Sequence, residues 1–285
     1  MENRLVETQQ GLVFDASVAG KPGQPLVLML HGFSVSRYFW NAQVEALGKA
    51  GYFAVAPNQR GYSAGARPDP AELGNYRIDR LIADALAIAA RLGVEGQRFH
   101  LAGHDWGGSL AWNIADQHPE RLASLTILSR PHPQAFNRAL KMPDGDQARR
   151  SKHHTTFLEP DAVPGILADD ARWLRTRWKK NGIPEAAMEA HLSVIGNSAA
   201  LEAALAWYRA RGTTLQPVGP TKVPTLYIWG DADDTVGRAA AEFTGEFIAA
   251  PYRFEVLADA GHYAADQMPG KVAALMLEHI GRHPI

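Results

Sequence analysis

The feature that most constrains this chain is a regular alternation of short apolar segments with segments whose apolar residues recur at helical spacing. Such alternation is typical of a parallel sheet covered by helices. The segment 5–18 predicts a hairpin with its turn at Gln10 and Gly11, and 78–92 predicts an amphipathic helix ending at Gly93. The strands that we predict span 26–30, 53–56, 99–102, 122–128, 225–229 and 253–257. We therefore expect an α/β fold with a mostly parallel sheet.

The alternation stops after Ser129, and strand character returns only at Val223. The region 133–214 between them is rich in tryptophan, lysine and arginine, and helical stretches begin near Asp161, Asp170, Pro184 and Ala199. We predict that 133–214 is an inserted helical cap, and that 1–132 and 215–285 are the two parts of one core.

Composition excludes several classes of protein. The 285 residues carry 29 Lys+Arg against 30 Asp+Glu, a balance that argues against a nucleic-acid binder. The absence of cysteine excludes disulfides, thiolate catalysis and cysteine-based zinc sites. The N-terminus is acidic and polar, unlike a secretory signal, and no apolar run approaches the roughly 18 residues that span a bilayer. We therefore expect a cytoplasmic protein; its oligomeric state is left open.

The strongest local pattern is Gly103-His-Asp105-Trp-Gly107, between a predicted strand and a helix. It has the spacing of the nucleophile elbow G-x-S-x-G, with aspartate in place of serine. Glycines permit a strained turn that projects residue 105 beside a helix N-terminus, which favours negative charge. The alternatives are a helix N-cap, or a phosphate loop, which lacks its G-K-[ST] ending here. The pattern predicts Asp105 as a nucleophile.

A second motif, Leu28-Met-Leu-His31-Gly32-Phe33, ends another predicted strand. In a fold of this type, the loop after that strand supplies one backbone amide to an oxyanion hole, and the residue after the nucleophile supplies the other. Phe33 and Trp106 are therefore the expected oxyanion-hole amides.

A third motif, 227–234, is a strand followed by a carboxylate-rich turn. A buried carboxylate here can hold an imidazole in one tautomer and stabilise its protonated form. We choose Asp233, with Asp234 and Asp231 as alternatives, and a solvated acidic turn as the competing interpretation. A calcium loop is excluded because Thr235 and Val236 occupy positions that need an oxygen ligand and glycine.

The fourth motif, Ala258-Asp-Ala-Gly-His262-Tyr, follows the last predicted strand. The chain order Asp105, Asp233, His262 is nucleophile, acid, base, the order of α/β-hydrolase triads. No H-E-x-x-H is present, and the pair His153-His154 lacks the i, i+4 spacing of such a metal site. We expect neither a metal nor a cofactor.

Together the four motifs make the chain resemble, over nearly its full length, α/β-hydrolases of the epoxide hydrolase and haloalkane dehalogenase group. Gly103-His-Asp-Trp-Gly-Gly108, with its aspartate, is the specific part of this resemblance. Similar enzymes also share the segment 58–62, Asn-Gln-Arg-Gly-Tyr, which we interpret as a structural loop near the active site.

The resemblance also implies roles for cap residues. Epoxide hydrolases of this group use cap tyrosines to donate to the epoxide oxygen; one lies in a motif matched by Ala206-Trp-Tyr208-Arg, which implies Tyr208 as donor. The other precedes a stretch matched by Phe157-Leu-Glu-Pro160, and its position holds His153. Packing alone is the competing interpretation of both residues. We expect the substrate pocket to include His31, Trp106, His154 and Trp207.

Our leading hypothesis is an epoxide hydrolase that acts on an apolar or aromatic epoxide through an ester on Asp105. A carboxylate is ionised at neutral pH and attacks sp3 carbon, and His262 then activates water against the ester. The alternatives are a dehalogenase and a non-catalytic small-molecule-binding protein. Phe33 stands where haloalkane dehalogenases have asparagine, and Trp106 where fluoroacetate dehalogenases have arginine.

Overall fold

The computed structural model describes residues 1–211 and 217–285, and within them eight strands form one sheet. The strand order is β1-β2-β4-β3-β5-β6-β7-β8. β1 and β2 form an antiparallel hairpin, β2 is antiparallel to β4, and the remaining neighbours are parallel. The strands are β1 (Glu2–Glu7), β2 (Val13–Ala19), β3 (Leu26–Leu30), β4 (Phe53–Pro57), β5 (Phe99–His104), β6 (Leu122–Leu128), β7 (Thr225–Gly230) and β8 (Tyr252–Leu257). The predicted α/β class with a mostly parallel sheet is confirmed.

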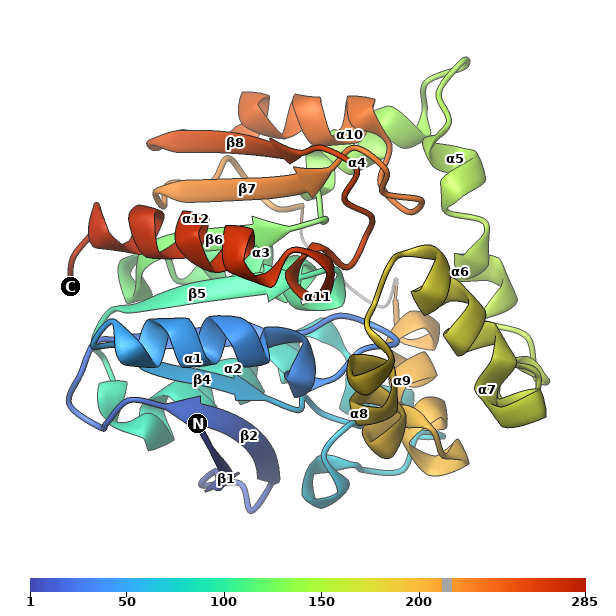
Figure 1. Ribbon diagram of the computed structural model, residues 1–285, viewed down its shortest axis with the longest axis horizontal. Helices are drawn as coiled ribbons and strands as arrows, with labels where there is room; N and C mark the ends of the chain where they lie inside the picture. The colour runs from blue at the N-terminus through green and yellow to red at the C-terminus, as the bar shows by residue number, and fades with distance from the viewer. Residues whose placement is uncertain (212–216) are drawn as a thin grey trace.

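The central strands β3 to β7 are buried along their whole length. Helices α1 and α12 cover one face of the sheet, and α2 and α3 cover the other (Figure 1). Strands covered on both faces need continuous apolar sequence, which explains why these segments could be predicted as strands. The core helices are α1 (Asn41–Lys49), α2 (Ile78–Ala89), α3 (Trp106–Gln117), α10 (Arg238–Phe243), α11 (Ala264–Gln267) and α12 (Pro269–Gly281).

Helix α2 illustrates how the sequence produces its element. Its apolar residues Leu81, Ile82, Ala85 and Ile88 are buried on the face toward the sheet. The chain then leaves the helix at Gly93, where φ is +96°, a conformation that glycine adopts without steric cost. Short 3-10 or π turns complete the connections: Arg37–Trp40, Ala64–Ala66, Leu73–Tyr76, Ala90–Val94, Pro119–Arg121 and Thr244–Phe247.

Helices α4 to α9 lie between β6 and β7 in the chain, and most of them sit beyond the carboxyl ends of the strands (Figure 1). Helices α7, α8 and α9 correspond to the helical stretches expected from the sequence, and α7 is interrupted at 168–171, where Asp169, Asp170 and Ala171 have positive φ. The short helices α4 to α6 were not anticipated. Their bounds are α4 (Pro133–Leu140), α5 (Gln147–Arg150), α6 (His153–Thr156), α7 (Ala162–Lys180), α8 (Glu185–Ile195) and α9 (Ser198–Arg209).

Helix α4 contacts the core as well as starting the inserted region. Arg138 pairs with Glu246 at 2.7 Å and its guanidinium lies 3.9 Å from the ring of Phe243 in α10. The predicted cap end at 214 lies outside the described residues. None of the described helices combines the length and apolarity needed to cross a bilayer.

Candidate active site

Asp105 lies at the turn between β5 and α3, in a backbone conformation that few residues adopt. Its φ is +49° and its ψ is −114°. The turn is tight: a Cβ on Gly103 would lie 2.4 Å from the carbonyl oxygen of Gly107, and a Cβ on Gly107 would lie 2.2 Å from that of Leu30. Strain of this kind is kept where surrounding structure enforces it, commonly at functional sites. The two glycines therefore allow the turn to present the Asp105 carboxylate at the carboxyl edge of the sheet.

The two oxygens of Asp105 have different surroundings. Oδ1 accepts a hydrogen bond from the backbone N–H of Phe33 at 3.1 Å, and Oδ2 lies 3.8 Å from Nε2 of His262. The residue is 8% exposed. Burial alone raises the pKa of this carboxyl, but the charges of His262 and Arg130 and the Phe33 amide outweigh it and lower the pKa below its ordinary value. Asp105 is therefore an anion at neutral pH with one oxygen held by an amide.

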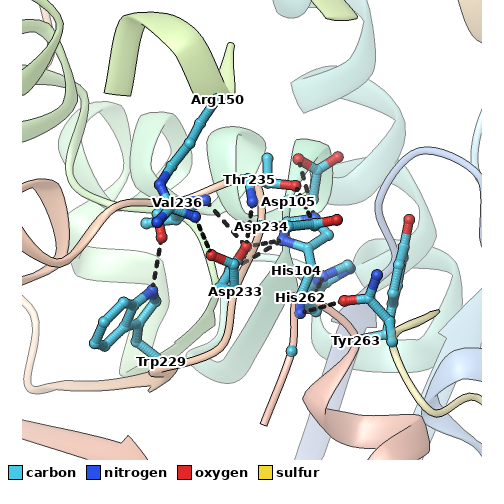
Figure 2. Close-up of polar contacts among 12 residues, drawn as sticks. His104, Asp105, Arg150, Trp229, Asp233, Asp234, Thr235, Val236, His262 and Tyr263 are labelled. Carbon is cyan, nitrogen blue, oxygen red and sulfur yellow. Dashed lines mark hydrogen bonds and ion pairs between the residues drawn. The ribbon is translucent and has the colours of Figure 1, made fainter. Parts of the chain in front are cut away.

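His262 lies between Asp105 and Asp233 (Figure 2). Its Nδ1 is 3.2 Å and 3.1 Å from the two carboxylate oxygens of Asp233. A carboxylate only accepts, so Nδ1 carries a proton, and in neutral His262 the lone pair is on Nε2, toward Asp105. The structure thus brings the three predicted triad residues together with the base facing the nucleophile.

Asp233 is fixed by its own loop after β7. It is 1% exposed, and its Oδ1 accepts from the backbone N–H groups of Thr235 at 2.7 Å and Val236 at 3.0 Å. The two alternatives face elsewhere: Asp234 pairs with Arg177 and Lys180, and exposed Asp231 accepts from the N–H of Asp259. Among the three carboxylates of this turn, Asp233 is the one that contacts His262.

The pKa of His262 is set by opposing effects. Burial lowers it, while the charge and hydrogen bond of Asp233 and the charge of Asp105 raise it, and the net result is a pKa above the ordinary value for histidine. In the resting site the imidazolium form is therefore favoured more than in a free histidine. Loss of the negative charge on Asp105 removes one of the effects that raise this pKa.

Several residues that hold the site were not found from the sequence. The backbone of His262 is hydrogen-bonded at both polar groups: its N–H donates to Oδ1 of Asn181 at 3.0 Å, and its carbonyl accepts from Nε2 of His104 at 2.9 Å. The neighbouring Tyr263 hydroxyl contacts Ser34 Oγ at 2.8 Å and accepts from Nε of Arg177 at 2.9 Å. These contacts join residues that are distant in the sequence, and no local pattern signals them.

Arg177, on cap helix α7, links the cap to the core at this point. Its Nη2 donates to Thr235 Oγ1 at 2.7 Å and lies 3.3 Å from Asp234 Oδ1. One guanidinium thus connects the cap to the loop that holds Asp233 and to the residue after His262.

Tyr208, on cap helix α9, lies over the oxyanion region in a cluster of aromatic rings. Ring centroids of Phe157, Trp106 and Phe33 lie 5.0, 5.1 and 5.3 Å from that of Tyr208. Burial, followed by the charge of Asp105, raises the pKa of the Tyr208 hydroxyl well above its ordinary value. Tyr208 therefore keeps its proton and can donate a hydrogen bond in an apolar environment.

The adjacent cap histidines are held in opposite tautomers. Nδ1 of His153 contacts the carbonyl oxygen of Arg150 at 3.0 Å, so it carries the proton and Nε2 is an acceptor in the neutral ring. Nδ1 of His154 accepts from Nη1 of Arg211 at 3.0 Å, so the proton is on Nε2. Burial is the main cause that lowers the pKa of His153 to about 4 and of His154 to about 3. Both rings are therefore neutral near pH 7, and His154 alone of the two has an N–H without an acceptor among the described residues.

The other residues expected in the pocket differ in their placement. His31 is fully buried, with Nδ1 2.9 Å from the carbonyl of Gly32 and Nε2 accepting from the N–H of Gln59 at 3.1 Å. Its ring therefore supports the loop below Asp105. Trp207 packs against Trp106 at 5.6 Å and donates from Nε1 to the carbonyl of Arg60 at 3.1 Å. His154 lies 5.7 Å from Tyr208 between ring centroids.

The segment 58–62 lies beneath this site and is tied to it. Gln59 Nε2 donates to the carbonyl of His31, and Tyr62 packs edge-on against the His31 ring at 4.5 Å. Arg60 forms a buried two-point ion pair with Asp84, at 2.6 and 2.7 Å. These contacts agree with the structural role expected for this loop.

The arrangement as a whole combines an ionised carboxylate, a base facing it, a backbone amide on its second oxygen, and neutral cap donors on the opposite side. In residues 1–211 and 217–285, no group of three or more His, Cys, Asp or Glu side chains is placed to hold a metal ion. The chemistry that the described side chains can perform is covalent attack by a carboxylate, followed by base-assisted hydrolysis.

The chain is similar in sequence and in fold to known proteins. Residues 25–269 match the family model described as alpha/beta hydrolase fold. The chain is 33% identical to epoxide hydrolase A of Mycobacterium tuberculosis, over 97% of this chain and 96% of that protein. It is 30% identical to mouse epoxide hydrolase 4, over 93% and 76% of the two chains. A solved structure from work on epoxide hydrolases in metagenomes from hot environments has a TM-score of 0.83 and 27% identity, with 98% of both chains covered.

Proposed function

The chain belongs to the alpha/beta hydrolase fold family, and we propose that it is an epoxide hydrolase that converts an epoxide and water into a vicinal diol. One observation carries the proposal: the Asp105 carboxylate stands in a nucleophile elbow with Oδ1 on the Phe33 amide and Oδ2 facing the base His262. The relatives named epoxide hydrolase, similar over nearly the whole chain, support it.

The first half-reaction is ring opening by Asp105. Oδ2 is the attacking oxygen, because Oδ1 is held by the Phe33 amide at 3.1 Å. As the new C–O bond forms, the ring C–O bond breaks and its electron pair moves to the epoxide oxygen. Tyr208 donates a hydrogen bond and then its proton to that oxygen, since its raised pKa keeps it protonated in the resting enzyme. The product is a hydroxyalkyl ester of Asp105.

Two cap histidines are candidates for a second donor. His153 occupies the position that the resemblance indicates, but its neutral tautomer leaves Nε2 as an acceptor. His154 has the tautomer of a donor and lies 5.7 Å from Tyr208 between ring centroids. The neutral forms of the two rings therefore favour His154, and the variants described in the Discussion separate them.

The second half-reaction is hydrolysis of the ester. Neutral His262 removes a proton from water through Nε2, the water oxygen attacks the carbonyl carbon of the Asp105 ester, and the Phe33 and Trp106 amides bind the oxyanion. Asp233 stabilises the imidazolium that forms, at 3.1 to 3.2 Å. Collapse of the tetrahedral intermediate releases the diol, whose leaving oxygen takes a proton from His262. Asp105 is left as a carboxylic acid that carries the second proton of the water, and transfer of this proton to the Tyr208 oxygen restores both residues.

The substrate that suits this site is an apolar or aromatic epoxide. The rings of Phe33, Trp106 and Phe157 pack around the Tyr208 ring. The centroids of these three rings lie 5.0 to 5.3 Å from that of Tyr208, and those of Phe33 and Phe157 lie 4.8 Å apart. Burial of apolar substrate surface between such rings contributes about 25 cal/mol per Å² to binding.

The test is intact-protein mass spectrometry of His262→Gln after exposure to an aryl epoxide, a bromoalkane, fluoroacetate and a nitrophenyl ester in separate tubes. Blocking the second half-reaction traps the first. We expect an adduct equal to the mass of the whole epoxide, absent in the double variant with Asp105→Ala. His118→Gln, at a half-buried position outside the site, is the control and accumulates no adduct.

The other outcomes are equally specific. An adduct that lacks the halogen, formed in preference to the epoxide adduct, would assign the chain as a dehalogenase. No adduct in any tube, together with no turnover by the unmodified protein, would favour a binding protein that retains the fold.

A further inference from the structure

A cavity of about 290 Å³ adjoins the proposed active site on the side of Trp106. At about 30 Å³ for each water in the liquid, it has room for roughly ten waters or for part of an organic ligand. Trp106, the residue after Asp105, belongs both to this cavity and to the aromatic cluster around Tyr208. Much of the lining is apolar: Ile78, Trp106, Pro133, Phe136, Trp207, Pro217 and Val218.

Three arginines line the same cavity, and two of them have no carboxylate partner. Arg77 pairs with Asp79, another lining residue, at 3.0 Å. Arg130 and Arg211 form no ion pair with any residue in 1–211 or 217–285, and residues 212–216, Gly-Thr-Thr-Leu-Gln, contain no carboxylate. Among the described residues, no carboxylate is therefore ion-paired with either of these two positive charges in the cavity.

The partners of these two guanidinium groups are neutral. Arg130 lies 5.0 Å from the Phe136 ring, and Arg211 donates to His154 and lies 6.0 Å from the Trp106 ring. Each group has five N–H donors in a planar fork that fits a carboxylate, and within residues 1–211 and 217–285 most of these donors have no hydrogen-bond acceptor. Burial and the charge of Arg130 lower the pKa of Arg211 to about 10, so the Arg211 guanidinium stays positive at neutral pH.

A buried hydroxyl in the cavity wall lacks a partner as well. Ser109 is 6% exposed, lines the cavity, and has no hydrogen bond to its Oγ within the described structure. It lies one helical turn after Asp105, and its N–H donates to the Asp105 carbonyl at 2.9 Å. A buried hydroxyl without a partner is unfavourable because its lost hydration is not compensated, and a bound polar ligand group would relieve this cost.

The positive charges act on the nucleophile. The charge of Arg130 is among the causes that lower the pKa of Asp105, and the charge of Asp105 raises that of Arg211. The two arginines thus lie within electrostatic reach of the reacting carboxylate, on the Trp106 side.

We propose that this cavity binds the carboxylate of an organic acid that carries the epoxide, with Arg130 and Arg211 as its ionic partners and Ser109 as a further donor. The apolar walls hold the chain between the carboxylate and the epoxide. This inference rests on the proposed function and narrows its substrate class to epoxides with a carboxylate at one end.

The test compares terminal epoxides of straight-chain fatty acids of graded length with their methyl esters. The ratio of kcat/KM for acid to kcat/KM for ester is measured at low salt. We expect the ratio to exceed one and to peak at one chain length, and to fall roughly tenfold in Arg130→Gln and in Arg211→Gln, as loss of a charge-assisted hydrogen bond implies. A ratio of one or less at every length in the unmodified protein would overturn the proposal.

Arg138→Gln is the matched control, because Arg138 lies on the same inserted region but pairs with Glu246 at the surface. Its acid-to-ester ratio should equal that of the unmodified protein. If Arg130→Gln does not fold, Arg211→Gln alone decides, since Arg211 is an exposed residue. An equal ratio in Arg211→Gln and Arg138→Gln would contradict the proposal.

A binding measurement separates this inference from the proposed function. If neither acids nor esters are turned over, epoxide hydrolysis fails, but calorimetric titration with octanoate and octanol still tests the cavity. Octanoate binding that exceeds octanol binding and is lost in Arg211→Gln supports the carboxylate site. Equal binding of octanoate and octanol overturns it.

Discussion

The two sides of the active site are built in different ways. On the core side, Asp233 and His262 follow strands β7 and β8, and hydrogen bonds to Asp233 and His104 hold the ring and the carbonyl group of His262. On the cap side, Tyr208, His153 and His154 come from helices α9 and α6 and lie among aromatic rings. The core side is a fixed polar network, whereas the cap side is an apolar wall with a few donors.

This difference indicates which half-reaction depends on each region. In the proposed mechanism, the charged residues of the core side hydrolyse the ester, whichever alcohol the ester carries. The cap side contacts the epoxide oxygen and the rest of the substrate. Changes on the core side should therefore slow ester hydrolysis, and changes on the cap side should slow ring opening and alter substrate choice.

The largest effect is expected on the core side, from Asp233→Asn. The amide cannot stabilise the imidazolium or hold its tautomer, so we expect steady-state turnover to fall roughly 10³- to 10⁴-fold. The ester on Asp105 should still form and accumulate, as detected by intact mass. Asp231→Asn, at the exposed neighbour, is the control with near-normal turnover. Loss of ester formation in Asp233→Asn would contradict the assignment of ester hydrolysis to the core side and ring opening to the cap side.

A smaller effect, with the opposite kinetic signature, is expected from Tyr208→Phe. Removal of one general acid should slow ring opening roughly 10²-fold, with no accumulation of ester because hydrolysis is untouched. Single-turnover measurements that follow the fluorescence of Trp106 and its neighbours resolve the two steps. Tyr252→Phe removes another buried hydroxyl that has no partner in the described residues, and it should leave both steps unchanged. Slowed ester hydrolysis in Tyr208→Phe would contradict the assignment.

The two cap histidines provide a second test of the role of the cap side in ring opening. If the tautomers in the structure hold during catalysis, His154→Gln should slow ring opening roughly tenfold, as expected for a second and weaker donor. His153→Gln should have a lesser effect, since glutamine also donates to the Arg150 carbonyl. Each variant is the control for the other in the same single-turnover measurement. The reverse order would show that His153 donates as an imidazolium.

The smallest expected effect is a shift in the titration of His262, followed by NMR of its ring protons. Asp233 and Asp105 both raise the pKa of His262, so each substitution by asparagine should lower it, and Asp233→Asn should lower it more. The imidazolium form is favoured below that pKa, so the base is active only above it. Conversion of Asp105 to a neutral ester acts like Asp105→Asn, and the acid limb of ester hydrolysis should therefore lie at lower pH than the resting titration. An unchanged pKa of His262 in Asp105→Asn would show that the charge of Asp105 does not influence the titration of His262.

Much of the core could be predicted because its signals are local. The central strands are apolar runs, the elbow requires glycines at 103 and 107, and each motif residue directly follows a strand. Parallel strands place their carboxyl ends at one edge, so local motifs meet there without further information. For this reason Asp105, Asp233 and His262 were identifiable as a group, and the structure places them in contact.

The helices and contacts of the cap were much harder to predict from the sequence. Helices α4 to α6 are short, and helices of four residues carry no periodic signal. The kink at Asp169 and Asp170 contains no proline or glycine from which it could have been predicted. The roles of Asn181, Arg177 and Ser34 depend on contacts with residues far away in the chain.

The sequence was sufficient to predict the α/β class, the order of the main strands and helices and Asp105 as the candidate nucleophile, because these follow from periodicity and from the glycines that a tight turn requires. Three properties became visible only in the tertiary structure. They are the contact between Asp233 and His262, the tautomers of the cap histidines, and the cavity that Arg130 and Arg211 share with Ser109. Those properties depend on distances between residues that are remote in the chain, and electrostatic and hydrogen-bond energies depend on such distances and on burial.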